Sequence, residues 1–353
     1  MTKNTIKKEK IEIEKGNNKS PYIPKNKTIF IDHGEILNTL AIAIKDNLNL
    51  LIIGESGTGK TAAIRHMAEL TKNGLRRVNL NGGTTADELV GRQMINEKGT
   101  YWVDGVLTEA MRNGDWIVLD EINAALPEVL FVLQPVMDDD GYLVLYEKDD
   151  KEIVKRHPTF RIFATCNPPE YAGTKEMNIA LLSRFAICIN TEFPKPAKEL
   201  EIIKHHLGSV IANSTMAIKL VDMANETRKA KETENSEYAI NTRDVLNILR
   251  LAQQIDPIEA LCLAFANKLD NTSNKALRTM AKLHLPMNKK QANTKRTKID
   301  QINQIKTGNE YIIDADMQNT YFGITEDKTK IAEILQGNKE LLEIIKESDK
   351  ENG

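Results

Sequence analysis

A glycine-rich octapeptide that directly follows an apolar run places the tightest constraint on this fold. Residues 54–61 read GESGTGKT, after the apolar sequence NLLII and before the helical sequence TAAIRHMAEL. The segment matches the pattern G-x-x-x-x-G-K-[ST] in the strand, loop and helix order that the pattern requires. Its glycines allow backbone N–H groups to close around phosphates at a helix N-terminus. The segment therefore predicts a nucleotide-binding loop rather than a plain glycine-rich turn.

The loop also supplies predicted ligands for a nucleotide and its metal ion. Lys60 is expected to reach the β- and γ-phosphates, and the Thr61 hydroxyl is expected to ligate Mg²⁺. ATP and Mg²⁺ are accordingly the predicted cofactors. The residues predicted to contact the nucleotide are Gly54, Glu55, Ser56, Gly57, Thr58, Gly59, Lys60, Thr61 and Asp120.

Two adjacent carboxylates end a second apolar run. Residues 116–123 read WIVLDEIN, so Asp120 and Glu121 close a predicted buried strand. Neighbours on a strand point to opposite faces, and a buried carboxylate requires a cation or hydrogen-bond donors. We expect Asp120 to hold Mg²⁺, through water, at the carboxyl end of a strand beside the phosphate loop. We expect Glu121 to orient and deprotonate the attacking water.

The pattern along the chain predicts two folded regions and two extensions. Residues 1–27 are rich in Lys, Asn and Glu and predict a mostly disordered tail. Residues 28–192 alternate β-rich and helical runs, which is typical of a mainly parallel α/β sheet. Residues 193–285 have helical spacing and predict a small all-helical domain. Residues 286–353 predict a basic linker followed by a helical extension. The predicted strands are Leu50–Ile53, Arg77–Leu80, Trp116–Leu119, Phe160–Thr165 and Ala186–Ile189.

Composition excludes several classes of protein. Lys and Arg number 48 against 50 Asp and Glu, a net charge of −2, which disfavours a globally basic nucleic-acid binder without excluding a local basic patch. The three cysteines show no metal-ligand spacing and predict a reducing compartment. The N-terminus lacks the apolar core of a signal peptide, and no run approaches the length of a membrane span. A cytoplasmic protein without a membrane partner is the expectation.

Further motifs, in the same order as in a known family, complete this picture. FATCNPP (163–169) follows a predicted strand, and ALLSRF (180–185) and INTRDVLNILR (240–250) come after it. Together with the phosphate loop, they resemble an AAA+ ATPase of the MoxR/CbbQ group, which has dynein-related and CobS-like relatives. The resemblance covers roughly residues 28–285. It implies a P-loop NTPase fold, a three-layer α/β sandwich with a parallel sheet, followed by a small helical lid.

The resemblance also implies roles for three more residues. Asn167 would contact the attacking water or the γ-phosphate, and Arg184 would act as an arginine finger in the neighbouring subunit's site. Arg243 is the candidate for a phosphate contact within its own subunit, with Thr242 or Asn241 as the helix cap. Arg250 is the rival to Arg243.

Two hairpins are predicted within the α/β region. GRQMINEKGTYWVDGVL (91–107) interrupts a helical stretch with two β-like runs around NEKG. GYLVLYEKDDKEIVKRH (141–157) has a second turn at Lys148–Asp150. The inserts of the resembled group lie at these two places. The alternative for each is a surface hairpin that only packs its aromatic residues.

The functional expectation is a ring-forming ATPase, a hexamer, that binds ATP·Mg²⁺ between subunits and remodels a protein partner. By resemblance, such partners include proteins with a von Willebrand A domain and enzymes that are activated or loaded with metal. Two other roles stay open: the ATPase subunit of a cobaltochelatase-like metal chelatase, and a nucleic-acid-directed motor.

Overall fold

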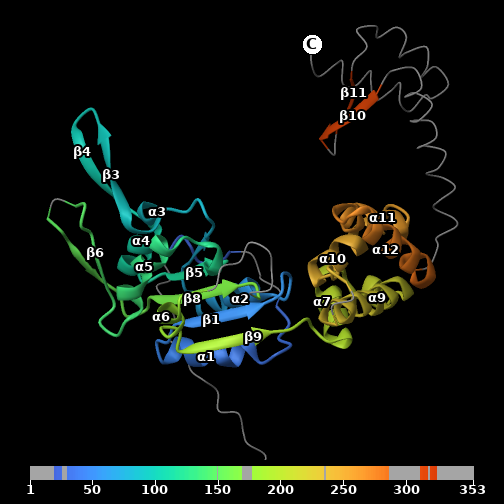
Figure 1. Ribbon diagram of the computed structural model, residues 1–353, viewed down its shortest axis with the longest axis horizontal. Helices are drawn as coiled ribbons and strands as arrows, with labels where there is room; N and C mark the ends of the chain where they lie inside the picture. The colour runs from blue at the N-terminus through green and yellow to red at the C-terminus, as the bar shows by residue number, and fades with distance from the viewer. Residues whose placement is uncertain are drawn as a thin grey trace, which may run out of the picture.

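A computed structural model of the protein describes five stretches in full: residues 20–25, 30–148, 150–168, 177–233 and 236–285 (Figure 1). For residues 311–316 and 319–323 it describes the backbone, which forms the antiparallel strands β10 (Tyr311–Asp316) and β11 (Asn319–Gly323). This strand pair was not predicted from the sequence. The predictions for residues 1–19, for the basic linker and for the C-terminal helix at 330–347 lie outside the described residues.

Five parallel strands form the central sheet, in the order β2-β5-β8-β1-β9. All five predicted strands are present, with ends that differ from the prediction by at most two residues. The near-continuous apolar sequences of the three central strands β5, β8 and β1 are typical of a parallel sheet that is covered on both faces. The strands are β1 (Leu50–Gly54), β2 (Leu75–Asn79), β5 (Trp116–Asp120), β8 (Arg161–Cys166) and β9 (Ile187–Thr191).

Helices cover both faces of this sheet. Leu50 and Ile52 pack into one apolar cluster with helices α1 (Ile36–Lys45) and α2 (Lys60–Thr71). Leu51, whose side chain points the other way, packs into a second cluster with helices from the opposite layer. The opposite layer contains α3 (Ala86–Val90), α4 (Val106–Asn113) and α5 (Pro127–Met137). The predicted three-layer α/β sandwich is therefore confirmed.

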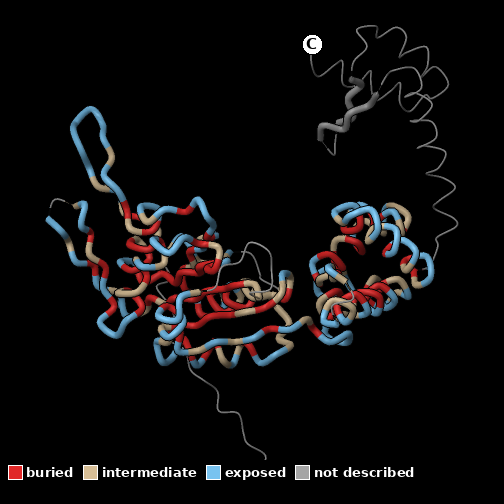
Figure 2. The backbone as a smooth tube through the Cα atoms, in the orientation of Figure 1, coloured by how far each residue is buried: buried red, intermediate tan, exposed pale blue. Residues whose placement is uncertain are grey.

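Both predicted hairpins are present. The first pairs β3 (Gly91–Asn96) with β4 (Gly99–Asp104) and interrupts the chain between α3 and α4. The second pairs β6 (Tyr142–Val144) with β7 (Ile153–Lys155). Figure 2 shows that the first hairpin projects from the sandwich with mostly exposed residues.

A helical region with its own apolar core follows β9. Gly208, with φ +91°, separates its first two helices, α7 and α8. Helix α12 was not predicted separately; it buries Leu277 and Ala281. The helices are α7 (Pro196–Leu207), α8 (Ser209–Ala212), α9 (Thr215–Glu232), α10 (Thr242–Leu251), α11 (Pro257–Ala264) and α12 (Asn271–His284).

Three short helices complete the described elements: α6 (Ile179–Leu182) and the 3₁₀ turns η1 (Ile122–Ala124) and η2 (Ala266–Lys268). Throughout the described residues, each helix is too short or too polar to cross a lipid bilayer.

Part of the segment predicted as a tail contacts the edge of the sheet. The backbone oxygen of Tyr22 accepts a hydrogen bond of 3.0 Å from the N–H of Leu75 in β2. The guanidinium of Arg76 lies 3.8 Å from the centre of the Tyr22 ring, and the Ser20 hydroxyl donates to Asp115 over 2.7 Å. Residues 20–25 are thus anchored on β2, and the prediction of disorder does not hold for them.

Candidate nucleotide-binding site

The phosphate loop lies where β1 ends and α2 begins, at the carboxyl ends of the sheet strands. In Figure 1 these ends point toward the helical region. Gly57 and Gly59 have φ of +84° and +93°, conformations that side chains with a Cβ rarely adopt. A Cβ on Gly54 would lie 2.1 Å from the Thr191 hydroxyl oxygen of β9. The glycines are therefore required for the tight course of this loop.

Lys60 points back into its own loop. Its ammonium donates hydrogen bonds to the backbone oxygens of Gly54 and Glu55, the latter over 3.0 Å, and to the Asn167 Oδ1 atom over 3.2 Å. Burial lowers the pKa of Lys60, while the nearby Cys166, Asp120 and Glu55 act in the opposite direction. The structure thus brings two predicted site residues, Lys60 and Asn167, into direct contact.

Asp120 is buried, and it accepts contacts from three elements. Its Oδ1 atom accepts hydrogen bonds from the Thr61 hydroxyl over 2.8 Å and from the Thr165 hydroxyl over 2.7 Å. Its Oδ2 atom pairs with the Nε of Arg77 on β2. The two predicted Mg²⁺ ligands, Thr61 and Asp120, therefore lie side by side. Their oxygen atoms belong to the ligand type that Mg²⁺ prefers.

Glu121 lies in a different environment from its neighbour. It is exposed and has φ +56°, a left-handed conformation that is uncommon for residues other than glycine. This conformation places it at the start of η1, just beyond the end of β5. One carboxylate is thus buried beside Thr61, while the other is open to solvent and available for proton transfer.

Asn167 follows β8 and is fixed from two directions. In addition to the contact with Lys60, its backbone oxygen accepts a hydrogen bond of 3.3 Å from the side-chain amide of Asn123. Asn123 lies in η1, two residues after Glu121, so it couples the ends of β5 and β8. Asn123 was not predicted from the sequence as a site residue.

Arg184 lies at the opposite end of β1 from the phosphate loop, next to the amino end of that strand. The side-chain amide of Asn49, the residue just before β1, donates over 3.0 Å to the backbone oxygen of Arg184. The Arg184 guanidinium pairs with Asp138 over 2.7 Å and donates to the backbone oxygen of Ala180. Since the phosphate loop follows the carboxyl end of β1, Arg184 is separated from its own loop by the length of that strand.

The start of α10 abuts the phosphate loop. Asn241 is the helix cap, because its Oδ1 atom accepts a hydrogen bond of 2.9 Å from the N–H of Asp244. A Cβ on Gly57 would lie 2.8 Å from this same oxygen. Arg243 is exposed on the first turn of α10, while Arg250 lies in the last turn and bonds Asn247 over 3.3 Å.

Comparisons with known proteins agree with this geometry. Residues 49–185 match the family model described as an AAA domain of the dynein-related subfamily. Protein CbbQ of Hydrogenophilus thermoluteolus is 30% identical over 213 residues, which span 60% of this chain and 78% of CbbQ. The chain is a member of the MoxR/CbbQ group of AAA+ ATPases.

Two further relatives match this AAA+ protein, and in each case the match covers most of the relative's own length. Protein NorQ of Paracoccus denitrificans (strain Pd 1222) is 29% identical over 64% of this chain and 81% of NorQ. The aerobic cobaltochelatase subunit CobS of a Sinorhizobium species is 28% identical over 70% of this chain and 79% of CobS.

The AAA+ fold and the activity follow from this membership: the protein binds nucleotide and hydrolyses ATP. Its loop fits the phosphates, since glycines, an inward lysine and the N-terminus of α2 converge on one place. The Thr61 and Asp120 oxygens would hold Mg²⁺, which would neutralise phosphate charge there.

Two positively charged side chains of this AAA+ site, Arg77 and Lys231, were not predicted from the sequence. Arg77 reaches Asp120 from the neighbouring strand, and Lys231, from the end of α9, pairs with Glu55 of the loop. A signal for Arg77 existed, since β2 carries two adjacent arginines within a strand of the central sheet. Nothing in the sequence marks Lys231, which lies 176 residues from its partner.

Proposed function

We propose that this ATPase works as a homo-oligomeric ring, a hexamer, that uses ATP·Mg²⁺ hydrolysis to remodel a protein partner as an enzyme-activating chaperone. Within one subunit, Lys60 would hold the β- and γ-phosphates, and Thr61 and Asp120 would hold Mg²⁺. Glu121 would accept the proton of the attacking water, and Asn167 would position that water.

The position of Arg184 carries the proposal of a ring. Its backbone oxygen lies at the amino end of β1, the opposite end of that strand from its own phosphate loop, and its guanidinium pairs with Asp138. Arginine fingers of phosphoryl-transfer sites are supplied either within the chain or by a partner. A second copy that places its Arg184 at this loop would complete the site. Arg243 would add a contact from the same subunit, since its helix cap already abuts Gly57.

The first hairpin is the proposed partner-binding surface. Ile95 and Tyr101 near its tip are 81% and 45% exposed, while Trp102 at its base packs against the core of the sandwich. Aromatic and aliphatic side chains at an exposed tip are suited to contact with another protein. The proposed partner is an enzyme or a protein with a von Willebrand A domain, as in the group that the chain resembles.

Two measurements test this function. The mass of Glu121→Gln with ATP should be that of a hexamer at micromolar concentration, because the variant retains nucleotide at the subunit interface. A monomer under these conditions would contradict the ring. The same variant, held in the ATP state, should retain a protein partner that Lys60→Ala, which cannot hold ATP, does not retain.

A metal-chelatase role is the second candidate. The similarity to the cobaltochelatase subunit CobS, over 79% of that protein, favours it. In that case the retained partner would be a chelatase subunit, and ATP hydrolysis by the complex would depend on the metal ion and the tetrapyrrole.

A further inference from the structure

Two side chains far apart in the sequence meet at the phosphate loop. The Lys231 ammonium, at the end of α9, lies 3.0 Å and 3.1 Å from the two carboxylate oxygens of Glu55. Glu55 is the second residue of the loop, directly after Gly54. The helical region therefore delivers a positive charge to the nucleotide site, independently of Arg243.

We propose that Lys231 is a phosphate-sensing cation of the helical region. The Lys231 ammonium pairs with Glu55 at the loop, and the terminal phosphate of a triphosphate bound there would compete with that carboxylate for it. This inference rests on the proposed phosphate-binding role of the loop, and it identifies a further binding residue of that site.

The position of Glu55 supports this role. Its backbone oxygen accepts a hydrogen bond of 3.0 Å from Lys60, the residue that the loop motif directs at the β- and γ-phosphates. Its carboxylate is close enough to raise the pKa of Lys60 against the effect of burial. The two ammonium groups are thus anchored on one residue, and a lysine has a flexible four-carbon stem with which to change partner.

The exposure of the pair favours exchange. Lys231 and Glu55 are 25% and 27% exposed, and ion pairs with this much solvent contact contribute little to stability. A triphosphate with Mg²⁺ still offers charged terminal oxygens, to which an ammonium forms strong charge-assisted bonds. The terminal oxygens would therefore compete with Glu55 for the ammonium.

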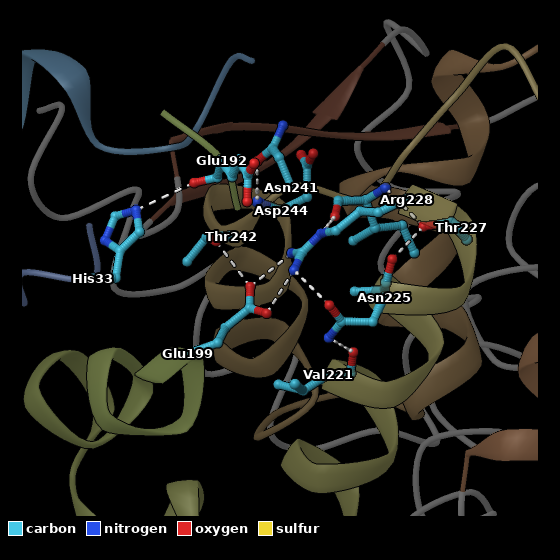
Figure 3. A network of polar contacts seen from close by, with 12 residues as sticks. His33, Glu192, Glu199, Val221, Asn225, Thr227, Arg228, Asn241, Thr242 and Asp244 are labelled. Carbon is cyan, nitrogen blue, oxygen red and sulfur yellow. Dashed lines mark hydrogen bonds and ion pairs between the residues drawn. The ribbon is translucent and has the colours of Figure 1, made fainter. Parts of the chain in front are cut away.

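The backbone from which Lys231 extends is tied to the rest of the helical region. Arg228, one turn earlier on α9, forms a bidentate pair of 2.7 Å contacts with Glu199 of α7 (Figure 3). The same Glu199 accepts a hydrogen bond of 2.8 Å from the Thr242 hydroxyl at the start of α10. These contacts fix the end of α9 beside the loop, so the Lys231 ammonium would change partner through its flexible side chain.

Lys231 could instead have a static role, in which it only neutralises the negative charge of Glu55. The two roles differ when Glu55 is neutral. A static lysine would then have no further effect on nucleotide affinity, whereas a phosphate-binding lysine would keep its effect.

The test is a double-mutant cycle with Glu55→Gln and Lys231→Met in the full chain. The affinity for a non-hydrolysable ATP analogue and for ADP is measured by fluorescence titration, and thermal melting confirms folding. We expect Lys231→Met to lower the affinity for the analogue about tenfold or more, as for loss of a charge-assisted hydrogen bond. The affinity for ADP should fall far less. Glu55→Gln should strengthen analogue binding, and the double variant should again be about tenfold weaker than Glu55→Gln alone.

Lys229→Met is the matched control, since Lys229 is exposed two residues earlier on α9. It should leave both affinities unchanged. If Lys231→Met has no effect in the Glu55→Gln background, or weakens both nucleotides equally, the inference is wrong. If the wild-type chain itself binds no ATP analogue, the proposed function of the loop fails instead.

Discussion

Asp120 and Glu121 are adjacent in sequence but differ in what surrounds them. Asp120 is 3% exposed and is contacted by two hydroxyls and Arg77, whereas Glu121 faces solvent in a left-handed conformation. Such a conformation costs free energy at a non-glycine residue and is often found at functional sites. We therefore expect the chemistry to divide by residue, with Asp120 holding the metal ion and Glu121 accepting the proton.

Glu121→Gln tests this division. The variant should bind an ATP analogue normally and hydrolyse ATP about 10²- to 10⁴-fold more slowly, because the amide cannot accept the proton of water. Asp120→Asn should instead raise the Mg²⁺ concentration that is needed for binding. Titrations of each variant with nucleotide and Mg²⁺ separate the two effects, and identical Mg²⁺ dependence in both would show that the roles are assigned wrongly.

Arg77→Ala is a second test at the residue scale. Arg77 pairs with the Oδ2 atom of Asp120, so it would compete with Mg²⁺ for that carboxylate. Removal of this cation should lower the Mg²⁺ concentration for half-maximal binding of an ATP analogue. Arg92→Ala, at an exposed site on β3, is the control and should change nothing. A higher Mg²⁺ requirement in Arg77→Ala would mean that Arg77 holds Asp120 in position for the metal ion.

At the scale of elements, the first hairpin breaks a helical stretch and rejoins it. Replacement of residues 95–101 with a short Gly-Ser turn should keep folding, assembly and basal ATP hydrolysis, because Trp102 still anchors the base of the hairpin. Remodelling of the partner should be lost. A thermal melt, a mass measurement and a remodelling assay decide: full remodelling by the shortened protein would exclude the hairpin as the working surface.

The Glu199–Arg228 pair is the main polar contact between the helices α7 and α9. Both side chains are almost fully buried, at 0% and 3% exposure. Arg228→Met alone should destabilise the protein by about 3–5 kcal/mol, because it leaves Glu199 as a buried, unpaired charge. Glu199→Leu combined with Arg228→Met should recover most of that loss. Denaturant unfolding measures both, and an additive loss in the double variant would contradict a paired role.

Elements with a continuous apolar run were predictable, and those defined by distant contacts were not. All five sheet strands were found from their apolar sequences, but β2 begins two residues before its prediction. The reason is Arg76, a charged residue that is nevertheless buried, because Asp115 and Glu109 pair with it. Sequence spacing could not reveal these partners, which lie 39 and 33 residues away.

At the scale of the whole molecule, the candidate site is built from segments that the sequence keeps far apart. The motif residues Lys60, Asp120 and Asn167 were identified from local patterns, and the structure brings them together. Helix α9 reaches the same loop through Lys231. Local patterns carry no information on such a contact, since only the folded helical region places it there.

We propose that each active site is completed by a second copy of the chain, and the mixing of two inactive variants tests whether the site is shared. Lys60→Ala lacks the phosphate-loop cation but keeps Arg184. Arg184→Ala keeps the loop but should lose about 10³-fold or more in rate, as for other arginine fingers. Mixed subunits should recover part of the ATP hydrolysis, because some interfaces then join an intact loop to an intact Arg184. With subunit exchange confirmed by mass, the absence of recovery at every mixing ratio would contradict a shared site.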